Sequence, residues 1–188
     1  FEGSNRNKRS IELDIKSAGA QEIVQKLALH ADIVVEGFRP GVAARLGFGA
    51  EQLRRFNPRL IYCSISGFGQ FGPDSNKPGH DLAYLAMAGA LAYKGQLRQP
   101  PRRGSLPVAD LVGGACASVA ILAAIRQRDA TGEGSTLDMS LYESALYATA
   151  ARFSLDTDAN SVTHLFPGND LFVCADGRQI ALTVVEEK

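Results

Sequence analysis

Short apolar segments alternate with helical patterns along the chain, and this alternation limits the fold more than any other feature. Residues 33–35 and 60–65 are short apolar runs, typical of strands that are buried on both faces. Around them, apolar residues recur at helical spacing in 17–30, 42–46 and 50–56. Strands that alternate with helices predict an α/β fold, with an open, mostly parallel sheet and flanking helices.

The remaining segments extend this prediction. Residues 9–15 alternate between apolar and polar, which predicts a half-buried strand, and the Gly- and Pro-rich residues 67–79 predict a loop. Apolar helices are expected over 81–92, 110–128 and 141–153, and a strand over 135–140. A hairpin is expected over 171–185, with its turn at Asp176-Gly177.

Composition excludes several classes of protein. The chain has 20 basic and 20 acidic residues, which argues against a dedicated nucleic-acid binder. We find no run near the roughly 18 apolar residues of a membrane span, so no membrane association is expected. Cys63, Cys116 and Cys174 are widely spaced and fit neither a disulfide framework nor a zinc site. A reducing, cytoplasmic setting without a bound metal is therefore expected.

Asp110 is the first candidate for chemistry, because it stands where a long apolar helix begins. Local sequence allows two interpretations of Asp110: the N-cap of that helix, or a reacting carboxylate. The positive end of a helix favours the ionised form, which can act as a nucleophile or a general base. Gly113 and Gly114 follow and leave the backbone bare, so a ligand could approach its amides.

His80 is the second candidate, within Gly79-His80-Asp81 at the junction between the glycine-rich loop and a helix. Asp81 is expected to be the N-cap of that helix. His80 is then either an ordinary loop histidine or a general acid/base, since histidine titrates near neutral pH. A histidine and an aspartate that face each other across a substrate carbon would form a two-base proton-transfer site. The sequence leaves open whether His80 and Asp110 face each other.

Cations follow the predicted strands, at the edge where open α/β sheets bind ligands. Lys16, Arg39 and Arg45 could contact phosphates, and Phe38 could stack on a base. The alternative for each cation is an ordinary solvated surface charge.

Taken together in this order, the motifs of the chain resemble those of the family III CoA-transferases, which include formyl-CoA transferase, carnitine CoA-transferase relatives and α-methylacyl-CoA racemase. The motifs are Asn5-Arg6-Asn7-Lys8-Arg9-Ser10, Leu13-Asp14-Ile15-Lys16, Glu36-Gly37-Phe38-Arg39-Pro40-Gly41, Arg45-Leu46-Gly47, Ser64-Ile65-Ser66-Gly67-Phe68-Gly69, Gly79-His80-Asp81, Ala109-Asp110, Gly113-Gly114, Thr131-Gly132-Glu133-Gly134 and Ala175-Asp176-Gly177. Each motif is short, but their order and spacing are specific, and they cover nearly the whole chain.

The resemblance implies roles for named residues. Asp110 matches the catalytic aspartate, which in the transferases attacks the acyl-CoA carbonyl to form an aspartyl anhydride and then an enzyme thioester. In the racemase branch, His80 would join Asp110 as the second acid/base group, and Glu186 resembles a further active-site glutamate. Residues implied in binding coenzyme A are Leu13, Ile15, Lys16, Gly37, Phe38, Arg39, Arg45, Gly79, Asp81 and Tyr84.

The resemblance also implies an organisation and three possible activities. Residues 1–155 would form the large Rossmann-like CoA-binding and catalytic domain without its usual N-terminal portion, and 156–188 the start of a smaller, truncated α+β domain. The substrate would be an acyl-CoA thioester, no metal is implied, and the chain would form an interlocked homodimer. The activity would be CoA transfer between carboxylic acids through Asp110; the alternatives are racemisation by His80 and Asp110, or CoA binding without catalysis.

Overall fold

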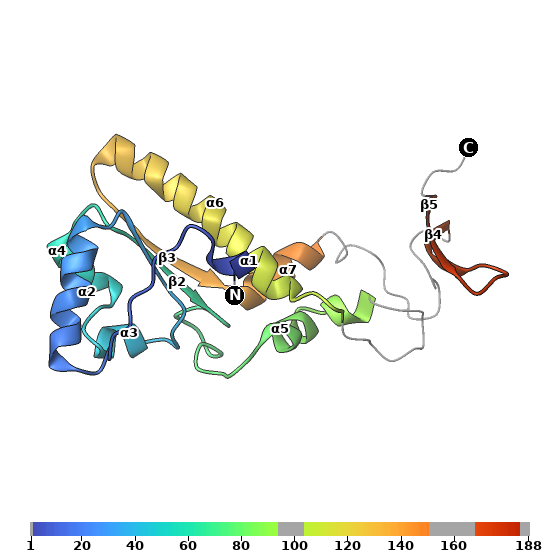
Figure 1. Ribbon diagram of the computed structural model, residues 1–188, viewed down its shortest axis with the longest axis horizontal. Helices are drawn as coiled ribbons and strands as arrows, with labels where there is room; N and C mark the ends of the chain where they lie inside the picture. Colours follow the sequence, from blue (N-terminus) through green and yellow to red (C-terminus); the bar gives the residue numbers. More distant parts are fainter. Residues whose placement is uncertain (1, 94–103, 151–167, 185–188) are drawn as a thin grey trace.

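The computed structural model describes residues 2–93, 104–150 and 168–184 (Figure 1). The helices are α1 (Glu2–Asn5), α2 (Ala18–His30), α3 (Val42–Arg45), α4 (Ala50–Phe56), α5 (Asp81–Met87), the 3-10 helix η1 (Ala90–Tyr93), α6 (Val108–Thr131) and α7 (Leu141–Thr149). The strands are β1 (Ile33–Glu36), β2 (Ile61–Ser66), β3 (Thr136–Ser140), β4 (Gly168–Val173) and β5 (Gln179–Val184).

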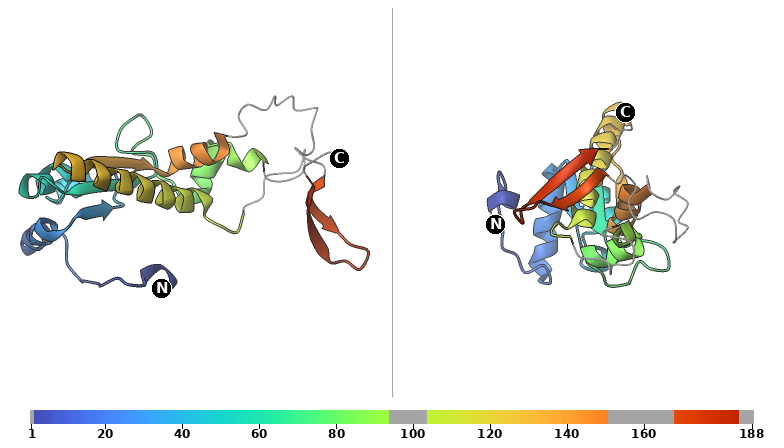
Figure 2. Two further views of the ribbon diagram at one scale, coloured as in Figure 1. Left: turned by 90° about the horizontal axis from the view of Figure 1, so that it is seen from above. Right: turned by 90° about the vertical axis from the view of Figure 1, so that its right-hand side faces the viewer.

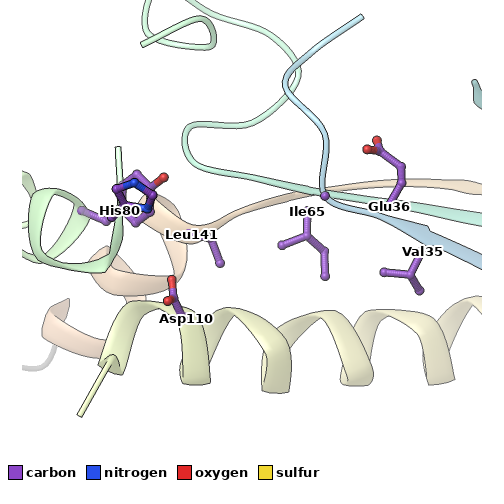
Figure 3. A pocket seen from close by; sticks show the side chains of 8 residues that line it. Val35, Glu36, Ile65, His80, Asp110 and Leu141 are labelled. Atoms are coloured by element: carbon purple, nitrogen blue, oxygen red, sulfur yellow. The ribbon is translucent and has the colours of Figure 1, made fainter. Parts of the chain in front are cut away.

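The central sheet confirms the predicted α/β class. Its strands lie in the order β1–β2–β3 and every pair is parallel, with Val34 opposite Tyr62 and Tyr62 opposite Thr136. Side chains on a strand alternate between the two faces of the sheet. Tyr62 packs among residues of α2, α3 and α4, whereas the Ile65 side chain points toward α6 (Figure 3). Helices therefore cover both faces of the sheet, as parallel strands require.

Two apolar clusters hold the helices in place. One lies between the sheet and helices α2, α3 and α4, where Leu53 and Leu60 are fully buried. The other joins α5, α6 and α7 beyond the carboxyl end of the sheet, around Tyr84, Ala109 and Ala145. This second cluster fixes the starts of α5 and α6 relative to each other, which matters for the site described below.

Helix α6 is the longest element and packs against β2, β3, α5 and α7. It ends before Gly132, whose φ of 81° provides the left-handed cap that often closes a helix. Near its end, the buried Arg128 donates a hydrogen bond to the Asp32 carboxylate at 2.9 Å. By length and composition alone α6 would suit a membrane span, so the expectation that no segment approaches one was wrong. In the structure it is one of the helices that flank the sheet.

Some predicted elements differ from the structure. Residues 9–15 form no strand; Figure 2 shows this segment running outside the sheet, without a neighbouring strand to pair with. Alternation gives a strand only where a partner supplies the hydrogen bonds. Helix α5 ends at Met87 rather than at residue 92, because the chain turns at Gly89, where φ is +73°, before η1 begins.

The C-terminal hairpin is confirmed. Strands β4 and β5 pair antiparallel, with Val173 opposite Gln179, and Gly177 lies in the turn at a φ of +81°. They form a two-stranded sheet of their own. The predicted boundary between residues 155 and 156 lies outside the described residues.

Gly134 provides a test of how tightly the loop before β3 packs. Its amide donates to the Pro58 carbonyl at 2.9 Å, and an added Cβ would overlap the backbone of Leu60. We expect Gly134→Ala to lower the free energy of unfolding by about 1–3 kcal/mol, the usual cost of overpacking. The measurement is urea denaturation followed by circular dichroism.

Gly114→Ala is the control for this substitution. Gly114 lies in α6, and an added Cβ there meets nothing within 4 Å. Alanine at this position should raise the stability by up to roughly 1 kcal/mol, through helix propensity. Equal effects of the two variants would contradict the packing described for Gly134.

Candidate active site

A pocket of about 490 Å³ lies at the carboxyl end of the central sheet (Figure 3). It is lined by Val35, Glu36, Gly37, Ile65, His80, Tyr84, Asp110 and Leu141. These residues come from the ends of β1 and β2, from the start of α7 directly after β3, and from α5 and α6. The carboxyl ends of parallel strands are where open α/β sheets bind ligands, so this is the candidate active site.

Asp110 enters the pocket from the first turn of α6. The helix begins at Val108, with Pro107 in the N-cap position, so Asp110 is the third helical residue. Of the two interpretations of Asp110, the N-cap is therefore wrong, and the helix begins two residues earlier than predicted. Its side chain is exposed and rises from α6 toward the pocket (Figure 3). A carboxylate that is free of capping contacts is available for chemistry.

His80 lines the same pocket from the start of α5. It occupies the N-cap position of α5 and makes no side-chain capping hydrogen bond. Figure 3 shows His80 and Asp110 at the same end of the pocket, whereas the Glu36 side chain points away from Asp110. The structure thus brings His80 and Asp110, which are 30 positions apart in the sequence, into one pocket.

Asp81 plays a different part from the one predicted. It is the first residue of α5 rather than its N-cap. Its Oδ1 accepts hydrogen bonds from the backbone amides of Ala109 at 2.7 Å and Asp110 at 3.4 Å. Asp81 therefore caps α6, across an interhelical contact, and it lines neither of the pockets described here.

The electrostatic surroundings of Asp110 favour its protonated form. Partial burial raises the pKa of the Asp110 carboxyl group, and the neighbouring Asp81 carboxylate raises it further, while His80 lowers it. The net direction is upward, opposite to the effect expected from the helix start alone. Desolvation and a like charge therefore outweigh the favourable contributions, as is common at reactive sites.

Tyr84 closes one wall of the pocket. Its side chain is only 5% exposed, and its ring packs edge-on against Phe68 at a centroid distance of 5.2 Å. Burial raises the pKa of Tyr84, and the Asp110 carboxylate raises it further. A Cβ added at Gly67 or Gly79 would overlap the Tyr84 ring, so these two glycines make room for the tyrosine.

A second pocket, of about 900 Å³, adjoins the first and shares Gly37, Ile65, His80, Tyr84 and Leu141 with it. Of the residues that the resemblance implies in CoA binding, the two pockets bring together Gly37, Phe38, Arg39, Gly79 and Tyr84. The other five line neither pocket: Leu13, Ile15, Lys16, Arg45 and Asp81.

The second pocket also contains residues that the sequence analysis missed. Ser75 and Lys77 line it from the glycine-rich loop, and Lys77 forms an ion pair with Asp74 at 2.7 Å. The position of Lys77, a cation two residues before the Gly79-His80-Asp81 motif, could have indicated this part of the pocket. The Phe38 ring, by contrast, packs near Phe48 at a centroid distance of 6.0 Å.

The paired glycines of α6 serve packing rather than ligand approach. Gly113 is buried, and a Cβ there would overlap the Leu141 side chain of α7. Gly114 faces open space and lines neither pocket. The hypothesis that both glycines expose amides to a ligand is therefore not supported by their positions. Gly113 instead lets α6 approach the helix that carries Leu141.

Two further expectations concern residues or groups beyond this pocket. Glu186 lies outside the described residues, so its predicted role stays a prediction. Within residues 2–93, 104–150 and 168–184, His, Cys, Asp and Glu side chains form no group of three that could hold a metal ion.

Comparison with known proteins identifies the family of the chain. The model of CoA-transferase family III matches residues 1–188. The chain is 42% identical over 147 residues to acetyl-CoA:oxalate CoA-transferase of Acetobacter aceti, covering 78% of the chain and 38% of that protein. It is 38% identical over 147 residues to human alpha-methylacyl-CoA racemase, covering 77% of the chain and 38% of that protein.

Solved structures agree with the sequence relatives. The crystal structure of a CaiB/BaiF family protein from Brucella suis superimposes with a TM-score of 0.83 at 30% identity, covering 92% of this chain and 48% of that one. The chain spans less than half the length of each of these three relatives.

His80 should contribute to the ionisation of Asp110. His80 lowers the Asp110 pKa because a protonated imidazole stabilises the carboxylate. Replacing it by neutral Gln should therefore raise the Asp110 pKa further above that of an ordinary aspartate. Carboxyl ¹³C NMR titration of both proteins measures this shift. A His30→Gln variant serves as the control, since His30 ends α2 and lines neither pocket; an Asp110 pKa that is unchanged in His80→Gln would contradict the arrangement.

Proposed function

Because this chain belongs to CoA-transferase family III, we propose that it acts on acyl-CoA thioesters and transfers coenzyme A between carboxylic acids, with Asp110 as the nucleophile. The observation that carries the proposal is the Asp110 carboxylate, which enters a pocket at the carboxyl end of a parallel sheet. Asp110 is exposed at the third position of α6, so a substrate can approach its carboxylate oxygens. The relative named acetyl-CoA:oxalate CoA-transferase supports this class of reaction.

The proposed reaction uses one carboxylate twice. An Asp110 oxygen attacks the acyl carbon of the donor thioester, and the C–S bond breaks to release CoA thiolate and leave a mixed anhydride. The thiolate attacks the Asp110 carbonyl carbon, which releases the donor carboxylate and leaves an aspartyl-CoA thioester. An acceptor carboxylate then attacks the aspartyl-CoA thioester, which releases CoA thiolate and leaves a second mixed anhydride. The thiolate attacks the acyl carbon of the acceptor, which forms the new acyl-CoA and frees the Asp110 carboxylate.

The adjoining pocket is the proposed site for the rest of the acyl-CoA molecule. Arg39 and Lys77 both line it, and their charges suit the phosphates of coenzyme A. Phe38 and Leu91 add apolar surface. We include the interlocked homodimer that the resemblance implies in the same proposal, with sedimentation velocity as its test.

Racemisation is the second candidate function, and one observation favours it. His80 and Asp110 line the same pocket, so two groups that exchange protons stand at one site. In this reaction one group removes the α-proton of the acyl-CoA and the other returns a proton to the opposite face. The similarity to human alpha-methylacyl-CoA racemase supports the same alternative. Binding of CoA without turnover is the third candidate, and calorimetry with CoA separates it from no binding at all.

Covalent capture tests the role of Asp110. After incubation with an acyl-CoA, borohydride should reduce an aspartyl thioester to the alcohol, and peptide mass spectrometry should locate the change at residue 110. Asp110→Asn should lose the adduct, and CoA transfer should fall by more than about 10³-fold, as expected for a nucleophile. Asp129→Asn, at the exposed far end of α6, is the matched control and should behave like the wild type. An adduct that persists in Asp110→Asn would refute the proposal.

Replacement of His80 decides between the two reactions. If the chain racemises its substrate, His80→Ala should slow α-proton exchange in deuterated water by roughly 10²–10⁴-fold, the contribution of a general acid/base. If it transfers CoA, His80→Ala should still form the Asp110 adduct. Exchange that survives unchanged in His80→Ala would rule out the two-base reaction.

A further inference from the structure

The start of α6 is capped by another helix rather than by its own N-cap residue. Pro107, in the N-cap position, makes no side-chain capping hydrogen bond, and proline has no side-chain acceptor to offer. The first amides of a helix have no partner within the helix and need an acceptor from elsewhere. Asp81 supplies it, from 28 positions earlier in the chain, by accepting the Ala109 amide at 2.7 Å.

This cap joins the two turns that carry the candidate reacting groups. Asp81 follows His80 directly at the start of α5, and its Oδ1 also accepts the amide of Asp110 itself at 3.4 Å. Ala109 is fully buried within the cluster that joins α5, α6 and α7, so the capped turn is packed as well as hydrogen-bonded. One carboxylate thus ties the backbone of Asp110 to the turn that presents His80.

We propose that Asp81 is a positioning residue for Asp110: by capping α6 from α5, its carboxylate fixes Asp110 against His80 in the pocket. The proposal rests on the proposed function, in which Asp110 is the reacting carboxylate. Asp81 lines neither pocket, so it acts through Asp110 rather than by contact with a substrate.

The same carboxylate also sets the charge environment of Asp110. Partial burial raises the Asp110 pKa most, the Asp81 carboxylate raises it next, and His80 opposes both. The other titratable groups that line the pocket are Tyr84 on α5 and Glu36 on β1, whose side chain points away from Asp110. Facing Asp110 from β2 and α7 are Ile65 and Leu141, which carry no charge. Asp81 therefore holds Asp110 in place and opposes its ionisation.

Two substitutions separate these effects. Asp81→Asn keeps an amide oxygen that can accept the Ala109 amide but removes the charge. Asp81→Ala removes both the acceptor and the charge. Asp129→Asn removes a charge at the other end of α6 and is the matched control.

Carboxyl ¹³C NMR titration of Asp110 and amide hydrogen exchange are measured on the full 188-residue chain. We expect the Asp110 pKa to fall in both Asp81 variants, because a like charge is lost. In Asp81→Ala the Ala109 and Asp110 amides should also exchange roughly five-fold faster, the change expected for one lost helix cap. Asp129→Asn should change neither quantity.

The outcomes that would overturn the proposal are distinct. If amide exchange accelerates but the Asp110 pKa stays at its wild-type value, Asp81 is only a structural cap. If neither quantity changes in Asp81→Asn and Asp81→Ala, the contact between α5 and α6 is absent in solution. Should Asp81→Ala fail to fold, the titration of Asp81→Asn still decides. Neither measurement uses an acyl-CoA, so a missing Asp110 adduct would refute the proposed function while leaving this result intact.

Discussion

The parallel pairing of three strands is the constraint on which the site depends. Because β1, β2 and β3 run in the same direction, they all end at one edge, with Glu36, Ser66 and Ser140 as their last residues. The segments that follow must therefore begin side by side. Residues at these strand ends and in the following segments, such as Gly37 and Leu141, line the pocket. Helices pack on both faces of the sheet, and its carboxyl edge is where open α/β sheets bind ligands.

Local patterns in the sequence predicted most of the central fold. The apolar runs of β1 and β2, the helical spacing of α2 and α4, and the hairpin turn at Gly177 depend mainly on neighbouring residues, and all are present. Residues 9–15 have an equally regular pattern but form no strand, because a strand also needs a partner that no local pattern specifies. For a similar reason the start of α6 was predicted two residues too late, and Asp81 was predicted as the N-cap of α5 where His80 holds that position.

The two candidate reacting residues were predicted from the sequence, but the contacts that connect them were not. His80 and Asp110 were named from the ends of predicted helices, and the structure places both in one pocket. Asp81 was expected to cap its own helix, since cap preferences describe local sequence. Instead its carboxylate accepts amides that lie 28 and 29 positions away, and the packing of α5 against α6 makes these contacts possible. Lys77 was missed because a single cation in a polar loop resembles any solvated charge.

The raised pKa of Asp110, to which Asp81 contributes, affects the two candidate reactions differently. A nucleophile must lose its proton before it attacks, so a raised Asp110 pKa opposes CoA transfer at acidic pH. Proton exchange instead needs a group that can hold and release a proton near the working pH, which the same shift favours. His80 acts in the opposite direction, because its positive charge stabilises the Asp110 carboxylate. Burial shifts the Asp110 pKa upward most, and Asp81 and His80 then act on it in opposite directions. Both of these charged neighbours come from a single turn at the start of α5.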